Sequence, residues 1–208
     1  MPFDPRSLAL DGLFTDPNMF DSRRAWRRAG FEVLDPAKDT ECMVASHRSA
    51  PGCLFKKYTD DISQKEQIAN YAARIEGATR LAELIRRQSL QHVIVPRKHL
   101  HVLPQGFSKS AHILVVERLD VIGPKTSESR YHDIADVVLH ELLRVLVAFP
   151  GLDSNSKNVQ FTHSGKIAFI DLENWTRKGR NKVRLKSIGR YLSKDRYKRA
   201  CKILDELA

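Results

Sequence analysis

The chain has 208 residues, of which 42% are hydrophobic and 29% charged, and its formal net charge is +10. This length and apolar content allow one or two small lobes with a hydrophobic core, and they exclude a disordered chain. The longest apolar-rich segment, Val137 to Phe149, contains two charged residues and a histidine, so no run approaches the roughly eighteen apolar residues of a transmembrane span.

The first residues, MPFDPRSLALDGLF, have no basic segment ahead of a long apolar core, and this pattern disfavours a secretory signal. The three cysteines, Cys42, Cys53 and Cys201, have no paired spacing, which fits free thiols in a reducing compartment. We therefore expect a cytoplasmic protein, or one exported without a signal peptide. We also expect a monomer.

Residues Asp21 to Arg28 predict a short helix capped by Asp21 or Ser22, with Trp26 docking it on the core. Short breaks then separate three segments of β-strand character, which predict an antiparallel meander. These segments are 31–35 (FEVLD), 41–46 (ECMVAS) and 53–59 (CLFKKYT).

Two lysines stand in the third of these strands. Because side chains alternate along a strand, Lys56 shares one face with Leu54 and Tyr58, and Lys57 shares the other with Phe55. One lysine can point into a binding site. The alternative is an exposed pair on an edge strand.

Residues Asp61 to Arg87 predict one long helix. Gly77 lies in its middle and weakens it by about 1 kcal/mol relative to Ala. Glu76 flanks the apolar stripe, and both Glu76 and Glu66 can be solvated helix surface. The stripe is formed by Ile68, Tyr71, Ala72, Ile75, Ala78, Ala82 and Ile85.

Further strand-like runs follow at Val93–Val95, His99–Leu103 and Ile113–Glu117, and they supply the fourth and fifth strands of the sheet. The last of them runs into the polar sequence ERLD. Residues Pro124 to Ser129 (PKTSES) read as a linker. From Tyr131 to Phe149 the chain is apolar on more than one face of a helical period, which predicts a buried helix.

The polar residues with the most specific spacing lie between Gly151 and Trp175. Asp153 follows the predicted helix, and Asn158 precedes a predicted hairpin whose second strand ends at Asp171. The hairpin brings the chain back, so we expect the three side chains to converge. Carboxylate and amide oxygens suit Mg²⁺ on phosphate oxygens. The alternative is a surface loop with Asp and Asn as turn residues.

The C-terminal residues 177–208 carry most of the net charge. They hold twelve Lys and Arg against three acidic residues, a net of +9, which leaves about +1 for the other 176 residues. Two helices are predicted there, at Lys186–Leu192 and Asp195–Leu207. No aromatic RNA-binding signature or zinc-finger spacing supports nucleic acid as the partner. We expect a basic face that helps docking to an acidic partner.

The spacing of Asp153, Asn158 and Asp171 around a hairpin resembles the catalytic loop and metal-binding segment of the protein-kinase-like superfamily, D-x-x-x-x-N followed by D-F-G. The resemblance implies that Asp153 orients the attacking hydroxyl, and that Asn158 and Asp171 hold Mg²⁺ on the phosphates of ATP. Glu173 replaces the glycine of the family pattern and can add a metal ligand.

The same resemblance implies roles for residues nearer the N-terminus. Lys56, with Lys57 as the alternative, would contact the phosphates, and Glu76 or Glu66 would pair with that lysine. Val116 would stand at the gatekeeper position of a hinge. The backbone of Glu117 and Leu119 would contact the adenine.

The resemblance also implies an α+β fold with two lobes. Residues 1–29 would form a helical extension, 30–119 an N-lobe of five antiparallel strands with a helix, and 120–208 a strongly reduced helical C-lobe. Besides Glu173, two features depart from the family. The segment Asp35 to Asp39, which stands where the family has a glycine-rich loop, contains no glycine, although Lys38 can partly substitute for that loop. Gly151 and Leu152, rather than His and Arg, directly precede Asp153.

The implied activity is an ATP- and Mg²⁺-dependent transfer of phosphate to a Ser or Thr hydroxyl of a protein substrate, similar to that of minimal kinases among bacterial effectors. One alternative is a small-molecule kinase in the style of the aminoglycoside and choline kinases. The other is a nucleotide-binding pseudokinase that acts as an interaction module.

Overall fold

The computed structural model describes residues 10–34, 42–58, 62–107, 111–173, 175, 185 and 187–207. The chain divides into two compact units, Met1–Ile75 with Arg97–Arg118 and Glu76–Pro96 with Leu119–Ala208. Among the helices in the described ranges, none has both the length and the apolar character to cross a membrane. The class is mixed α and β.

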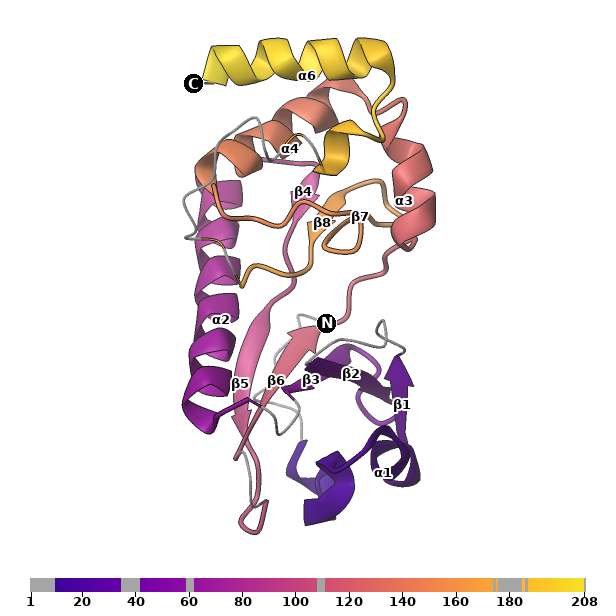
Figure 1. Cartoon of the computed structure of the whole chain (residues 1–208), viewed down its shortest axis with the longest axis vertical. Coiled ribbons are helices and arrows are strands. Elements are labelled where there is room, and N and C mark those ends of the chain that lie inside the picture. The colour runs from indigo at the N-terminus through magenta and orange to yellow at the C-terminus, as the bar shows by residue number, and fades with distance from the viewer. Residues whose placement is uncertain are drawn as a thin grey trace. The chain divides into compact units, whose positions relative to one another are not determined.

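The first unit contains a five-stranded antiparallel sheet (Figure 1). Its strands are, in spatial order, β1 (Phe31–Leu34), β2 (Cys42–His47), β3 (Cys53–Tyr58), β6 (His112–Glu117) and β5 (Lys98–Val102). The five antiparallel strands expected from the sequence are thus confirmed.

The run at Val93–Val95 does not join this sheet, which corrects its assignment. It supplies β4 (Val93–Ile94), which pairs in parallel with β8 (Ile167–Phe169) in the second unit. Val93 and Ile167 are both buried in the core of that unit. A short apolar run carries no periodicity that says which sheet it joins.

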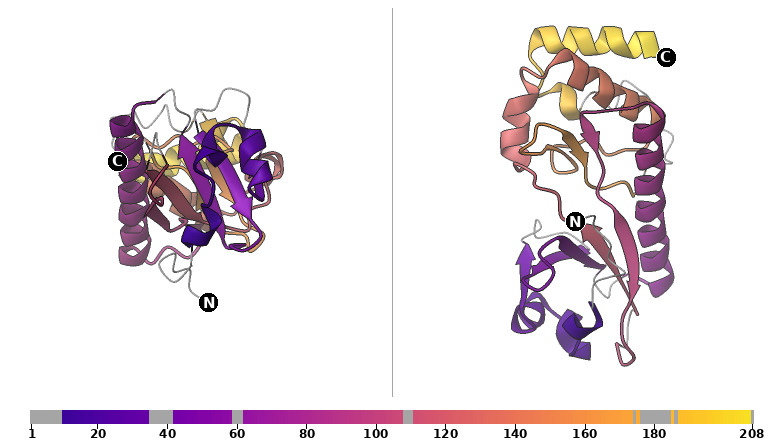
Figure 2. Two further views of the ribbon diagram at one scale, coloured as in Figure 1. Left: turned by 90° about the horizontal axis from the view of Figure 1, so that it is seen from below. Right: turned by 180° about the vertical axis from the view of Figure 1, so that it is seen from behind.

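The N-terminal residues pack on one face of the five-stranded sheet. They form two 3-10 turns, η2 (Leu10–Leu13) and η3 (Pro17–Phe20), and the short helix α1 (Arg23–Arg28), which lies beside β1 (Figures 1 and 2). The Ser22 hydroxyl caps α1 by accepting from the Ala25 N–H at 3.1 Å. Trp26 is fully buried, so its predicted role in docking the helix is confirmed.

The other face of this sheet meets the first half of α2 (Gln64–Arg87). The buried Tyr71 accepts a hydrogen bond from the Tyr58 N–H at 3.1 Å. The guanidinium of Arg74, also buried, lies 5.1 Å from the centre of the Tyr58 ring. Burial raises the pKa of the Tyr71 hydroxyl.

The buried stripe of α2 therefore differs from the predicted one. Ala72 and Ala82 are exposed, whereas Gln67 and Arg74 are buried. These two polar side chains can be buried because each has a partner: Gln67 donates to the Ile62 carbonyl at 2.9 Å, and Arg74 lies over an aromatic ring.

The second unit is built on a buried helix and a small sheet. The helices are α3 (Pro124–Tyr131), α4 (Asp136–Ala148) and α6 (Lys194–Leu207), and the sheet has the order β4-β8-β7, with β7 at Val159–Phe161. In Figure 1 and in the right panel of Figure 2, α4 lies between α6 and this sheet. Of the helix expected at Lys186–Leu192, residues 187–189 are helical.

The buried helix predicted from Tyr131 to Phe149 is present as α4 but begins at Asp136, and the segment Pro124 to Ser129 is part of α3 rather than a linker. Pro124 is tolerated in the first turn of α3 because no intrahelical bond needs its missing N–H. The last residue of α3, Tyr131, is buried in the core, where its hydroxyl donates to the Val159 carbonyl at 3.1 Å. The Ser127 hydroxyl also contacts this hairpin, by accepting a hydrogen bond from the Phe161 N–H at 3.0 Å.

A buried carboxylate on α4 holds the turn that precedes β4. Glu141 accepts hydrogen bonds from the backbone N–H groups of Gln91 and His92 at 3.1 and 2.7 Å, and it lies 3.1 Å from His92 Nδ1. Burial alone would raise the pKa of Glu141, but the hydrogen bonds from His92 and Gln91 outweigh it and the pKa is lowered.

We expect Glu141→Gln to lower the free energy of unfolding by about 1–3 kcal/mol at neutral pH, because the variant loses charge-assisted hydrogen bonds from the Gln91 and His92 N–H groups to a buried carboxylate. A carboxylate whose folded pKa is lowered stabilises the fold above its ordinary pKa of 4.5 and loses this effect as the pH falls through the folded pKa. Urea unfolding at several pH values should show the difference shrinking on acidification below pH 4.5. A difference independent of pH would contradict this account.

Candidate functional site

The loop that carries Asp153 begins at the end of α4. The Leu152 N–H donates to the Phe149 carbonyl at 3.2 Å, and both side chains are buried in the core of the second unit. This anchoring fixes the backbone one residue before Asp153, whose own side chain is exposed. The Asp153 carboxylate is thus exposed at the surface on a backbone that is anchored in the core.

Asp153 and Asn158 are in direct contact. The Asp153 carboxylate accepts from the Asn158 side-chain amide at 3.2 Å, from the Asn155 side-chain amide at 2.6 Å and from the Asn155 N–H at 3.2 Å. Five residues apart in the sequence, the two predicted site residues share one hydrogen-bonded loop.

The second strand of the hairpin returns to the same place. The register pairs Val159 with Phe169, and the Ile170 N–H donates to the Asn158 carbonyl at 2.8 Å. Asp171 is the next residue, and its carboxylate accepts from the Glu173 N–H at 3.3 Å. The backbone therefore delivers Asp171 to the end of the hairpin where Asn158 lies.

The side chains at this end of the hairpin suit a hard cation. Asn158 uses its NH₂ group to bind Asp153, and no described residue donates to its amide oxygen. Asp171 adds a carboxylate. Across the described part of the chain, no three His, Cys, Asp or Glu side chains are grouped to hold a metal by themselves. A Mg²⁺ ion here would complete its shell with phosphate oxygens and waters, as Mg²⁺ commonly does.

Lys56 and Lys57 lie in the central strand β3 and are only 8% and 3% exposed. The exposed edge-strand interpretation of this pair is therefore wrong. The Lys57 ammonium lies 5.5 Å from the centre of the Phe20 ring, on the face that carries the N-terminal residues. Lys56 shares the opposite face with Tyr58, which packs on Tyr71 of α2.

The two candidate glutamates lie on the exposed face of α2. The Glu76 side chain is 56% exposed and its carboxylate is 3.9 Å from Arg80. Glu66 is exposed as well, and its N–H donates to the Ser63 hydroxyl at 3.3 Å. An ion pair between either glutamate and the strand lysine stays a prediction.

At the predicted hinge, Val116 is buried with Tyr58 and Tyr71. The Glu117 carboxylate accepts from the backbone N–H, Nε and Nη2 of Arg97 at 3.0, 3.2 and 3.0 Å, and the Glu117 N–H donates to the Arg97 carbonyl at 2.8 Å. The Leu119 carbonyl accepts from the Val121 N–H at 3.1 Å. Lys38 lies outside the described residues.

Sequence reasoning missed the residues that support the loop. Asn155 accepts from the N–H groups of Lys157 and Asn158 at 2.8 and 3.1 Å, and an Asn between an Asp and a further Asn is the sequence signal of such a turn. The Ser156 hydroxyl donates to Glu128 of α3. This hydrogen bond is the main cause of the lowered pKa of Glu128.

Comparisons with known proteins are limited to structure. No family model matches the chain, and no curated protein matches its sequence. Among solved structures it is similar to WbdD, with 13% identity and a TM-score of 0.45 over 76% of this chain and 37% of that one. It is also similar to the apo form of the GRMZM2G135359 pseudokinase, with 12% identity and a TM-score of 0.42 over 78% and 63%.

The chain therefore spans 37% and 63% of the lengths of these two proteins. At TM-scores below 0.5, neither likeness identifies the fold. The sequence pattern and the geometry of the loop remain the basis for a function.

Gly77 allows α2 to approach the segment after Asp171. A Cβ at this position would lie 2.8 Å from Trp175 Cδ1 and 2.9 Å from both the Cβ and the carbonyl oxygen of Leu172. The carbonyl belongs to the backbone and cannot rotate away. Side chains larger than hydrogen therefore displace the residue that follows Asp171.

We expect Gly77→Ala to destabilise the protein by about 1–3 kcal/mol, because overpacking outweighs the gain of about 1 kcal/mol that Ala brings to a helix interior. Ala82→Gly is the control at an exposed position of the same helix, and should cost about 1 kcal/mol from helix propensity alone. Chemical denaturation measures both. A Gly77→Ala variant more stable than the parent would show that no close approach exists.

Proposed function

We propose that the protein is an ATP- and Mg²⁺-dependent phosphotransferase that acts on a Ser or Thr hydroxyl of a partner protein. The observation that supports this most is the hydrogen-bonded arrangement of Asp153, Asn158 and the backbone of Ile170, which precedes Asp171. It links in space the three residues of the D-x-x-x-x-N and D pattern, although eighteen residues separate the first from the last.

In the proposed reaction the substrate hydroxyl attacks the γ-phosphorus, the bond from that phosphorus to the bridging oxygen breaks, and ADP leaves. Asp153 orients the hydroxyl and takes its proton. The amides of Asn155 and Asn158 hold this carboxylate in one orientation. Positioned general-base help of this kind contributes about 10²–10⁴ in rate.

Asn158 and Asp171 are the proposed metal ligands, with the carboxylate of Glu173 as an additional one. Bound Mg²⁺ would neutralise charge on the phosphate oxygens. Lys56 is the proposed phosphate contact, and the backbone of Glu117 and Leu119 the proposed adenine contact.

Transfer of labelled phosphate to a protein acceptor tests the proposal. We expect Asp153→Asn to reduce the rate by about 10²–10⁴, the range of general-base catalysis. Asp171→Asn should reduce the rate at least as much, because it removes a ligand of the metal ion that neutralises charge on the phosphate. Asp133→Asn removes a carboxylate that is 85% exposed in the same unit and should leave the rate unchanged. An Asp171→Asn variant as active as the parent would contradict the assignment.

Thermal shift measurements separate the two lysines. At a hundred times its dissociation constant, ATP with Mg²⁺ should stabilise the parent by about 2.7 kcal/mol. We expect Lys56→Met to lose most of this ligand-dependent shift, and Lys57→Met to keep it even if the unliganded protein is less stable, because Lys57 lies against Phe20. The opposite result would reassign the phosphate contact to Lys57.

A nucleotide-binding pseudokinase is the second candidate. Two observations favour it: Glu173 stands where the family pattern has a glycine, and the Asp153 carboxylate already accepts three hydrogen bonds within its loop. A thermal shift with ATP but no transfer to protein or to small amino-alcohol and sugar acceptors would select this function. Transfer to the small acceptors alone would select a small-molecule kinase.

A further inference from the structure

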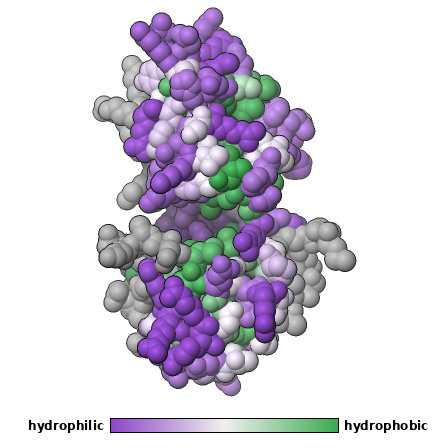
Figure 3. Space-filling view, turned by 90° about the vertical axis from the view of Figure 1, so that its right-hand side faces the viewer, coloured by the Kyte–Doolittle hydropathy of each residue, from purple (hydrophilic) through white to green (hydrophobic). Residues whose placement is uncertain are grey.

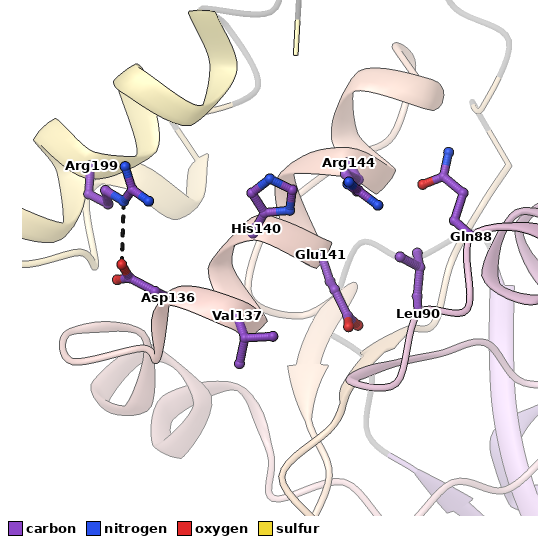
Figure 4. Close-up of a pocket in the computed structure, with 8 residues that line it drawn as sticks. All are labelled: Gln88, Leu90, Asp136, Val137, His140, Glu141, Arg144 and Arg199. Carbon is purple, nitrogen blue, oxygen red and sulfur yellow. Dashed lines mark hydrogen bonds and ion pairs between the residues drawn. The ribbon is translucent and has the colours of Figure 1, made fainter. Parts of the chain in front are cut away.

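The second unit has a hollow of about 350 Å³ on the side of α4 that faces α6 and the turn after α2 (Figure 4). It is separate from the Asp153 loop, none of whose residues line it. The lining residues are Gln88, Leu90, Asp136, Val137, His140, Glu141, Arg144 and Arg199.

The acidic groups of this hollow are already bound by the protein. Asp136 pairs with Arg196 and with Arg199, whose Nε lies 3.3 Å from Asp136 Oδ2. Glu141 is held by the turn at Gln91 and His92. Neither carboxylate is left to repel an incoming anion at full strength.

Two basic side chains of the hollow, by contrast, can still bind a ligand. His140 and Arg144 follow Asp136 at intervals of four residues and so lie along one face of α4, as Figure 4 shows. Neither the His140 nor the Arg144 side chain has a hydrogen bond or ion pair to any residue within the described ranges, and both side chains are partly exposed. The Arg144 guanidinium can therefore bind a carboxylate of another molecule.

An apolar surface adjoins these groups. Val137 lines the hollow and is 52% exposed, which is unusual for a large aliphatic side chain in this protein. Leu90 lines it from the turn after α2. The site therefore offers an aliphatic contact beside the Arg144 guanidinium, which pairs with no residue in the described part of the chain.

We propose that this hollow is a docking groove for an acidic peptide segment of a partner protein. Carboxylates of the segment pair with Arg144 and with the outer side of Arg199, and an aliphatic side chain rests on Val137. The surface at the α6 end of the unit is mostly hydrophilic (top of Figure 3). The net charge of +10, and the five Lys and Arg against three acidic residues in α6, favour acidic partners there.

The lining fits a peptide better than other anionic surfaces. It contains no Phe, Tyr or Trp ring, the side chains on which the bases of a single-stranded nucleic acid stack best. The apolar residues Ala200 and Ile203 of α6 are buried in the core against α4, so they are not presented to a lipid surface as those of an interfacial helix would be.

Fluorescence anisotropy without nucleotide tests the groove, so that its outcome does not depend on the proposed catalysis. The probe is a fluorescein-labelled peptide of repeated Glu-Glu-Leu units, and its matched control has Gln in place of Glu. We expect saturable binding of the Glu peptide, about fivefold weaker binding by Arg144→Gln, as for a partly exposed ion pair, and weaker binding by Val137→Glu. Arg24→Gln is the control, because it makes the same change of charge at an exposed residue of α1. This variant should bind like the parent.

Circular dichroism establishes that each variant is folded. Because Val137 is exposed, its substitution is the one least expected to disturb the fold. Equal affinity of the Glu and Gln peptides, no saturable binding, or an equal loss in Arg24→Gln and Arg144→Gln would overturn the proposal. Tighter, Arg144-dependent binding of an oligouridine or of phosphatidylserine vesicles would also overturn it, in favour of those partners.

Discussion

Asn158 ties together the two segments on which the candidate site depends. Its side-chain amide binds the Asp153 carboxylate, and its carbonyl accepts from the Ile170 N–H. One residue thus joins the loop after α4 to the end of β8. If this link is lost, the carboxylates of Asp153 and Asp171 have no common frame, and the oxygen ligands proposed for a metal ion are no longer held on the same side of the hairpin.

Buried residues on both sides of this link hold the loop and the hairpin in place. Leu152 and Phe149 anchor the loop in the core, and Tyr131 and Ser127 of α3 hold the hairpin through hydrogen bonds to Val159 and Phe161. Such buried, fully paired polar groups rigidify a site more than its exposed residues can. The exposed side chains proposed to bind the metal ion are therefore attached to backbone that these core contacts hold in place.

Sequence reasoning found the elements whose periodicity is strong and missed those whose signal is ambiguous. The strands of the antiparallel sheet follow from β-branched and aromatic runs, and the Asp153–Asn158 contact follows from their spacing before a hairpin. The helix at Pro124 was missed because Pro, Thr and Ser also begin turns. The burial of Arg74 depends on Tyr58, and the need for Gly77 depends on Leu172 and Trp175; these partners are distant in sequence, so no local pattern reveals them.

The central claim is that Asp153, Asn158 and Asp171 belong to one site for a metal ion with a nucleotide. Mn²⁺ prefers the same oxygen ligands as Mg²⁺, and it broadens nuclear magnetic resonance signals of nearby nuclei. With ATP present, substoichiometric Mn²⁺ should broaden the backbone amide signals of Asn158 and Asp171 before those of other residues, and Asp171→Asn should remove this selectivity. Broadening confined to residues outside the loop and hairpin, or equal in both proteins, would contradict the account.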